Sequence, residues 1–153
     1  MNRLLICLCV LPLAGCDVAV DTTGDDLPRV EWLKSPGTED LDLPFSAAVR
    51  VDDMLYLSGA LGNIPGTLNL AEGGIQGETR QTLENISATL VHFGSSMENV
   101  VKCTVFLADI GEWAAMNEVY TTYFPNKPAR SALGVSGVAL GARVEIECIA
   151  VIP

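Results

Sequence analysis

Two alternating segments near the end of the chain each carry an ionic side chain that could act on a small anion. Arg130 is flanked at strand spacing by Ala132 and Gly134, which leave open space beside its guanidinium group. Glu145 and Glu147 alternate with apolar residues, so one face of that strand is apolar and the other carries carboxylates. A guanidinium group binds a carboxylate through two parallel hydrogen bonds, and a half-shielded glutamate can accept a proton from water. On these residues alone a structural ion pair is the favoured interpretation, because ionic networks are common, and an anion site beside a general base is the alternative.

Apolar residues at three- and four-residue spacing predict two amphipathic helices ahead of these segments. The first is expected from about residue 78 to Gly94, and the second from Trp113 to a stop at Pro125. The glycine-rich stretch 61–77 is expected to be a loop, because it lacks both a lysine and the Gly-Lys-Ser/Thr ending of a phosphate-binding loop. The helices carry apolar residues at Leu83, Ile86, Leu90 and Phe93, and at Trp113, Met116, Tyr120 and Phe124.

The remaining alternating runs predict strands, and their order predicts the fold class. The order strand, strand, helix, strand, helix, strand, strand is typical of a two-layer α+β domain with both helices on one face of the sheet. Because two helices cover one face only, apolar residues on the other face are left for a partner. The expected strands are 46–51 and 54–59, joined by a tight turn at Asp52-Asp53, then 99–107, and two runs that begin at Pro128 and Val144.

Five cysteines are expected to have different fates. Cys7 and Cys9 lie in an apolar leader, Cys16 follows it, and Cys103 and Cys148 lie on predicted strands. Two cysteines in an exported domain can form a disulfide. The sequence cannot supply the required geometry, however, so two small, buried, unpaired side chains are the favoured expectation.

The beginning of the chain is expected to be a lipoprotein signal peptide, residues 1–15. Arg3 precedes an apolar run, residues 4–13, which is too short to span a bilayer as a helix. Residues 13–16 (LAGC) resemble the bacterial lipoprotein box, whose cysteine is lipidated and becomes the new N-terminus; an ordinary cleaved signal peptide is the alternative. Asp17 resembles the enterobacterial signal for retention in the inner membrane. The expected location is the periplasmic face of the inner membrane, with attachment through a lipid on Cys16.

The charge of the chain limits its partners. The formal net charge is −10, and removal of residues 1–15 takes away only Arg3, which gives −11. Such an acidic chain is repelled by phosphate backbones and anionic headgroups, so nucleic acid is not an expected partner. Residues 16–28, starting with the lipidated cysteine, are expected to be an acidic tether with a reach of roughly 20 Å. Residues 29–153 are long enough for one domain with its own core.

Seven segments occur in the order and spacing of the RidA family, the reactive-intermediate deaminases that hydrolyse enamines and imines. The resemblance covers about residues 29–153. The segments are PFSAAV at 44–49, LSG at 57–59, ETRQTLEN at 78–85, VKCTVFL at 101–107, MNEVY at 116–120, PARS at 128–131 and VEIE at 144–147.

The resemblance implies a chorismate-mutase-like fold with a mixed β-sheet. A local interpretation would pair the last two strands as a hairpin. The family fold instead places the last strand inside the sheet, beside the strand that carries Cys103. It also implies a homotrimer with ligand clefts between neighbouring subunits.

The resemblance further implies an activity: hydrolysis of 2-enamine and 2-imine acids, such as 2-aminoacrylate and 2-iminopropanoate, to 2-oxo acids and ammonia. Arg130 would anchor the substrate carboxylate, and Glu145 would position and activate the attacking water. Ser58, Gly59 and Asn117 match family positions that line the cleft. No metal ion or organic cofactor is implied.

Four residues depart from the family pattern. Phe45 stands where the family usually has tyrosine, Ala47 and Ala60 where glutamine is common, and Ala132 where cysteine is frequent. These differences make the expected substrate cleft more apolar. A non-catalytic protein that binds small carboxylates is therefore the alternative function. Ribonuclease activity, ascribed to some relatives, is disfavoured by the acidic charge and the lack of a basic aromatic surface.

Overall fold

The computed structural model describes residues 27–35 and 43–153. The expected signal peptide, Cys16 and the tether up to residue 26 lie outside these described residues. Within them, no helix is long and apolar enough to cross a membrane. The strands are β1 (Val30–Leu33), β2 (Ala48–Val51), β3 (Met54–Leu57), β4 (Ala60–Leu61), β5 (Val100–Leu107), β6 (Ala129–Gly134) and β7 (Val144–Val151), and the two α-helices are α1 (Gly74–His92) and α2 (Trp113–Tyr123).

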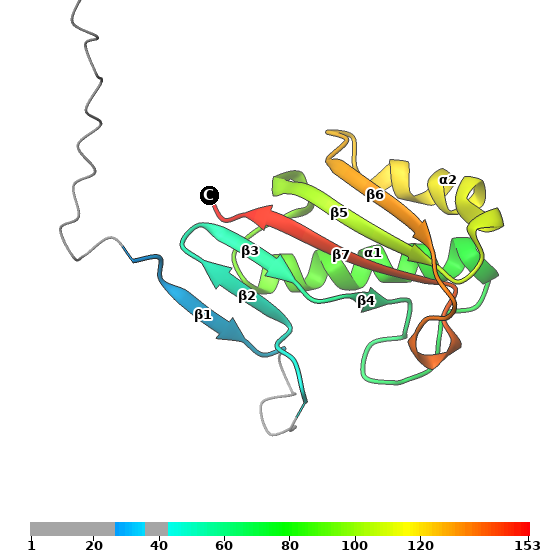
Figure 1. Cartoon of the computed structure of the whole chain (residues 1–153), viewed down its shortest axis with the longest axis horizontal. Helices are drawn as coiled ribbons and strands as arrows, with labels where there is room; N and C mark the ends of the chain where they lie inside the picture. The colour runs from blue at the N-terminus through cyan, green and yellow to red at the C-terminus, as the bar shows by residue number, and fades with distance from the viewer. Residues whose placement is uncertain (1–26, 36–42) are drawn as a thin grey trace, which may run out of the picture.

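The strands form one mixed sheet in the order β1-β2-β3-β7-β5-β6, with β4 also paired to β7. β5 and β6 run parallel, whereas β7 is antiparallel to both β3 and β5. Both α-helices lie on the same side of this sheet (Figure 1). The predicted two-layer α+β fold is confirmed. The last strand lies beside the strand of Cys103, as the resemblance implied, and not in a hairpin with β6.

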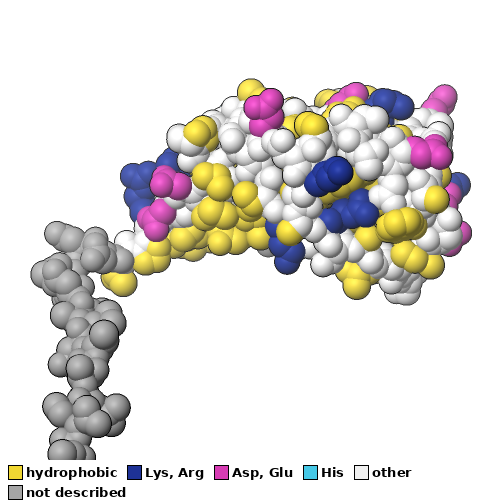
Figure 2. All heavy atoms as spheres, turned by 90° about the horizontal axis from the view of Figure 1, so that it is seen from above, with side chains coloured by type: hydrophobic (Ala, Val, Ile, Leu, Met, Phe, Trp, Pro, Cys, Tyr) yellow, Lys and Arg dark blue, Asp and Glu magenta, His cyan; other side chains and the backbone are white. Residues whose placement is uncertain are grey.

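Strand β7 separates the apolar core from the open face of the sheet. Val144, Ile146 and the other even-numbered residues up to Ala150 are buried toward the helices. The intervening residues, Glu145 among them, face the other way, which confirms the predicted alternation. The open face also carries apolar side chains. One of them is Trp32 of β1, which is 70% exposed in the single protomer. Figure 2 shows a broad patch of hydrophobic side chains on the strand-rich half of the surface.

Helix α1 begins earlier than the sequence predicts. It starts at Gly74, so the last four residues of the expected loop 61–77 are helical. Glycine has poor helix propensity, so the sequence pattern did not predict the first turn of α1. Gly77 is present because a Cβ atom there would overlap the carbonyl oxygen of Glu72. Gly73 has φ 98°, a left-handed conformation that suits glycine.

The expectation of two unpaired cysteines was wrong, because Cys103 and Cys148 form a disulfide. They lie directly opposite each other on neighbouring strands β5 and β7, with Cα atoms 4.1 Å apart. Opposed residues of an antiparallel pair bring their Cβ atoms close enough for this bond. Both side chains are buried, with 1% exposure each. The resemblance placed the two strands side by side, but the sequence did not give the register that sets the two cysteines opposite each other.

Candidate active site

Arg130 is held on the helix side of the edge strand β6 by three residues of helix α2. Its Nη1 donates a hydrogen bond of 2.6 Å to Oδ1 of Asn117. Its Cζ lies 4.6 Å from the ring centroid of Tyr120 and 5.8 Å from that of Trp113. A cation over an aromatic face is attracted to it, so the two rings fix the guanidinium group without neutralising it.

The structural ion pair that the residues alone favoured does not form between Arg130 and Glu145 within the described residues of one protomer. Within residues 27–35 and 43–153 the ion pairs join Arg29 to Glu31, and Arg143 to two other glutamates, and none includes Arg130. A guanidinium group has five N–H donors, and the side chain of Arg130 makes one hydrogen bond within these described residues. It retains the donors needed to bind a carboxylate at two points.

Arg130 lies in an open hollow of about 470 Å³ between the end of α2 and β6. Burial raises the pKa of the Tyr120 phenol above its ordinary value, and the positive charge of Arg130 opposes this change in part. Tyr120 is therefore neutral at physiological pH and presents an uncharged ring to the guanidinium group. The hollow is lined by Asn117, Tyr120, Thr121, Phe124, Lys127, Pro128 and Arg130. We call it the anion half-site.

Glu145 lies in a second group of predicted site residues, around the break between β3 and β4. Its carboxylate lies against Gly59, where an added Cβ atom would overlap Oε1. The hydroxyl of Ser58 donates a hydrogen bond of 2.6 Å to the carbonyl of Ser46, so towards a ligand its oxygen can only accept. Phe45, 61% exposed, lines a hollow of about 160 Å³ together with Ser58 and Gly59. We call these residues and Glu145 the carboxylate half-site.

Arg130 and Glu145 do not meet within one protomer, because they point to opposite faces of the sheet. In the register with β5, Arg130 lies beside Cys103, which faces the helices. Glu145 lies beside Phe106, three positions further along β5 and on the other face. The structure thus brings Asn117 to Arg130, and Ser58, Gly59 and Phe45 to Glu145. One ligand can contact both groups only if a second copy of the chain supplies one of them.

Sequence reasoning missed the aromatic support of Arg130, since it assigned Trp113 and Tyr120 to the core alone. The signal was their spacing, four residues before and three after Asn117, which places all three on one side of a helix.

The alanines that depart from the family pattern lie in both groups of site residues. Ala132 is half-buried, two residues beyond Arg130 and on the same face of β6. Ala47 and Ala60 line the hollow beside Phe45.

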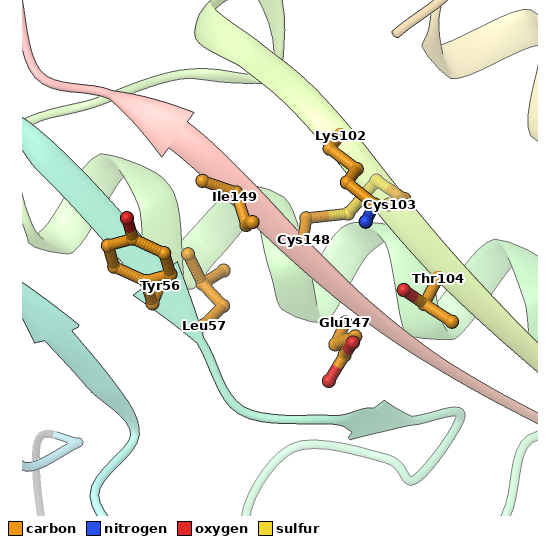
Figure 3. A pocket seen from close by; sticks show the side chains of 8 residues that line it. All are labelled: Tyr56, Leu57, Lys102, Cys103, Thr104, Glu147, Cys148 and Ile149. Atoms are coloured by element: carbon orange, nitrogen blue, oxygen red, sulfur yellow. A yellow bond between two sulfur atoms is a disulfide. The ribbon is translucent and has the colours of Figure 1, made fainter. Parts of the chain in front are cut away.

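A third hollow, of about 150 Å³, lies on the open face over the disulfide (Figure 3). Lys102 and Thr104 of β5 border it on one side, and Tyr56 on the other, with Glu147 and Ile149 of β7 between them. It contains none of the predicted site residues. No group of three or more His, Cys, Asp or Glu side chains suited to a metal ion occurs in the described part of the chain.

Comparison with known proteins supports one family. Residues 40–152 match the family model described as Endoribonuclease L-PSP. The chain is 48% identical over 109 residues to the goat 2-iminobutanoate/2-iminopropanoate deaminase, covering 71% of this chain and 80% of that protein. It is 42% identical over 123 residues to the human protein of the same name, covering 80% of this chain and 88% of its relative.

Solved structures agree with the sequence relatives. A Rid-family protein from Yersinia pestis is 35% identical and has a TM-score of 0.74, with coverage of 81% of this chain and 100% of that one. Because the family model and the relatives each cover most of the chain, the protein belongs to the RidA family of reactive-intermediate deaminases.

Proposed function

We propose that the protein hydrolyses 2-imino acids, and the 2-enamino acids that tautomerise to them, to 2-oxo acids and ammonia. The imine C=NH and one water become C=O and NH₃, so no oxidant, reductant or further reactant is needed. The named deaminase relatives support this reaction class. The observation that carries it is Arg130, a buttressed guanidinium group with no protein carboxylate paired to it in the described residues.

In this reaction the two half-sites have different tasks. Arg130 binds the substrate carboxylate through two parallel N–H donors, and Asn117 and the aromatic rings keep the fork in place. Glu145 accepts a proton from water as the water oxygen bonds to the imine carbon, and this proton is passed on to the nitrogen. In the resulting amino alcohol a second proton moves from the hydroxyl to the amino group, the C–N bond breaks to release ammonia, and the 2-oxo acid remains.

We propose a homotrimer as the assembly that joins the half-sites. Arg130 and Glu145 face opposite sides of the sheet, so each protomer offers different surfaces to two neighbours. Such head-to-tail contacts close into a ring when the rotation between neighbours is a simple fraction of a turn. Each of three clefts would then combine the anion half-site of one subunit with the carboxylate half-site of the next.

Subunit mixing tests both the reaction and the shared site. Arg130→Ala and Glu145→Gln chains with different tags are each expected to be inactive in an ammonia-release assay with 2-aminoacrylate generated in situ. When the two chains are co-expressed and assemble at random, each cleft takes Arg130 from one subunit and Glu145 from the next. Each of these residues is intact in half of the cases, so about a quarter of the clefts carry both intact groups. Ammonia release is expected to return to about that fraction of the wild-type rate.

Co-expressed wild-type chains with the same two tags are the control. Inactive mixed trimers would overturn the shared cleft. A wild-type trimer that binds 2-oxo acids and releases no ammonia would favour the non-catalytic binding protein. A stable wild-type monomer at micromolar concentration in light scattering would remove the cleft altogether.

We also propose that the protein is an exported lipoprotein anchored through Cys16. The support is the sequence of residues 1–16, because this segment lies outside the described residues. Mass spectrometry of protein from bacterial membranes is expected to find diacylglycerol on Cys16 as the first residue. The Cys16→Ser chain is expected in the soluble fraction or at the precursor mass, whereas Cys9→Ser, inside the leader, serves as the control for exchange of a cysteine. An unmodified Cys16 in the wild type would contradict the assignment.

A further inference from the structure

Glu78, in the second turn of α1, is a buried carboxylate that the reaction described above does not use; it is 5% exposed. It belongs to the segment ETRQTLEN, which contributes no residue to either half-site. We propose that Glu78 is a positioning residue, which holds the start of β7 so that Glu145 lies at the correct point for water and substrate. Because Glu145 faces away from the helices, this role is exerted through the backbone of β7. The inference rests on the proposed function and adds a residue to it.

The side chain of Glu78 binds the chain where β7 begins. Its Oε2 accepts a hydrogen bond of 2.8 Å from the backbone N–H of Arg143, two residues before Glu145. The carbonyl of Arg143 accepts from the N–H of Ala108 at 2.9 Å. Sheet pairing of β7 with β5 starts only at Val144, and a strand end without further bonds opens readily. Both backbone groups of Arg143 are therefore fixed, one by α1 and one by the segment after β5.

The backbone of Glu78 is packed against the end of β4, the short strand that pairs with Glu145. Gly62 lies so close to it that an added Cβ atom would overlap the carbonyl oxygen of Glu78. The preceding residue, Leu61, is the pairing partner of Glu145. Protein interiors are close-packed and transmit small displacements. One residue of α1 therefore fixes the start of β7 through its side chain and the end of β4 through its backbone.

Arg143 explains how a carboxylate is tolerated at this buried position, since a buried charge costs free energy unless it is paired. The Nε of Arg143 lies 3.9 Å from Oε1 of Glu78, and its Nη1 lies 2.6 Å from Oε1 of Glu112. A leucine at position 78 would avoid the cost of burying a charge. It could not accept the N–H of Arg143, however, and this hydrogen bond is what the carboxylate contributes.

Glu78→Gln and Glu78→Leu test this hydrogen bond. Glutamine keeps an oxygen that accepts the N–H of Arg143, so kcat for imine hydrolysis is expected to stay within about threefold of the wild-type value. Leucine removes the acceptor, and displacement of Glu145 is expected to lower kcat by about 10- to 100-fold. Arg130 lies in the other half-site, so the affinity for a 2-oxo acid is expected to be unchanged in both variants. Glu84→Leu, at an exposed position of the same helix, is the matched control and is expected to keep wild-type kcat.

Subunit mixing separates positioning from a general loss of stability, because two mixtures can carry the same substitutions in total. In the first mixture, one chain carries Glu78→Leu with Arg130→Ala, and the other carries Glu145→Gln. In the second, Glu78→Leu is moved to the Glu145→Gln chain. A cleft with both intact groups takes Glu145 from the Arg130→Ala chain, so only the first mixture combines Glu78→Leu with a working Glu145. Ammonia release is expected to be about 10- to 100-fold lower in the first mixture than in the second.

Equal ammonia release from the two mixtures would overturn the positioning role, whether both are fully active or both are equally weakened. Wild-type kcat in Glu78→Leu, with folding checked by circular dichroism, would overturn it as well. Glu78→Met, which also lacks a strong acceptor, takes its place if the leucine variant does not fold.

Failure of the proposed function would give different results. An inactive mixture of the single Arg130→Ala and Glu145→Gln chains would overturn the shared cleft, and kcat of Glu78→Leu relative to Glu78→Gln then decides the positioning role. Absence of hydrolysis in the wild type would overturn the reaction itself. Crystal structures of the two Glu78 variants then decide the positioning role: a displaced Glu145 backbone in the leucine variant alone supports it, and an unmoved backbone in both refutes it.

Discussion

Glu145→Gln is expected to lower kcat for imine hydrolysis by about 10²- to 10⁴-fold, the usual contribution of a general base. The amide keeps the shape of the carboxylate and fits the same space against Gly59, but it cannot accept a proton from water. In the proposed trimer, binding of a 2-oxo acid depends on the anion half-site of the neighbouring subunit, so its affinity is expected to change by less than about threefold. Steady-state kinetics and calorimetry on the same preparation separate these two quantities.

Glu147→Gln is the matched control for this variant. Glu147 lies two residues further along β7 on the same face, is exposed, and borders the third hollow rather than the carboxylate half-site. It is expected to retain wild-type kcat. Turnover by Glu145→Gln at the wild-type rate would show that Glu145 is structural and that water is activated elsewhere.

Arg130→Lys is expected to weaken 2-oxo acid binding by roughly 10- to 100-fold and to remove most deaminase activity. Lysine keeps the positive charge but loses the planar fork that binds a carboxylate at two points. It also loses the flat surface that lies over Tyr120. Loss of one charge-assisted hydrogen bond costs about 1.5–3 kcal/mol, which corresponds to that loss of affinity. Calorimetric titration with a 2-oxo acid measures it directly.

Arg29→Lys, in an exposed ion pair with Glu31 just before the first strand, controls for the exchange of one cation for another. It is expected to bind 2-oxo acids as the wild type does. Full affinity in Arg130→Lys would mean that charge alone holds the ligand, and the two-point model of binding would be wrong. If neither Arg130→Lys nor Glu145→Gln changes a measurable activity, the binding-protein alternative becomes the better interpretation.

The sequence predicted those features whose signal is local. Period-2 alternation in Val144–Val151 correctly separated a core face from the face of Glu145. The apolar spacing located α2 and the later part of α1, and aspartates at 52 and 53 marked the β2–β3 turn. The helical glycines at the start of α1 contradicted propensity for two reasons: Gly77 lies in close contact with the backbone of Glu72, and Gly74 has a φ of 63°, which favours glycine.

Features that depend on strand register could not be predicted from the residues alone. The position of β7 inside the sheet, beside β5, came from resemblance, since local patterns favoured a hairpin with β6. The pairing of Cys103 with Cys148 and the opposite orientation of Arg130 and Glu145 both follow from that register. Sequence spacing contains no information about which strands become neighbours after a parallel crossover such as β5–α2–β6.

The disulfide also changes the covalent topology of the anion half-site. Trp113, Asn117, Tyr120 and Arg130 all lie between Cys103 and Cys148, inside a loop that the sulfur–sulfur bond closes. A single proteolytic cut anywhere in that loop leaves both pieces attached to each other. For a nicked molecule, the strands on either side of the cut remain tethered at the centre of the sheet, so the Arg130 segment is retained until the bond itself is reduced.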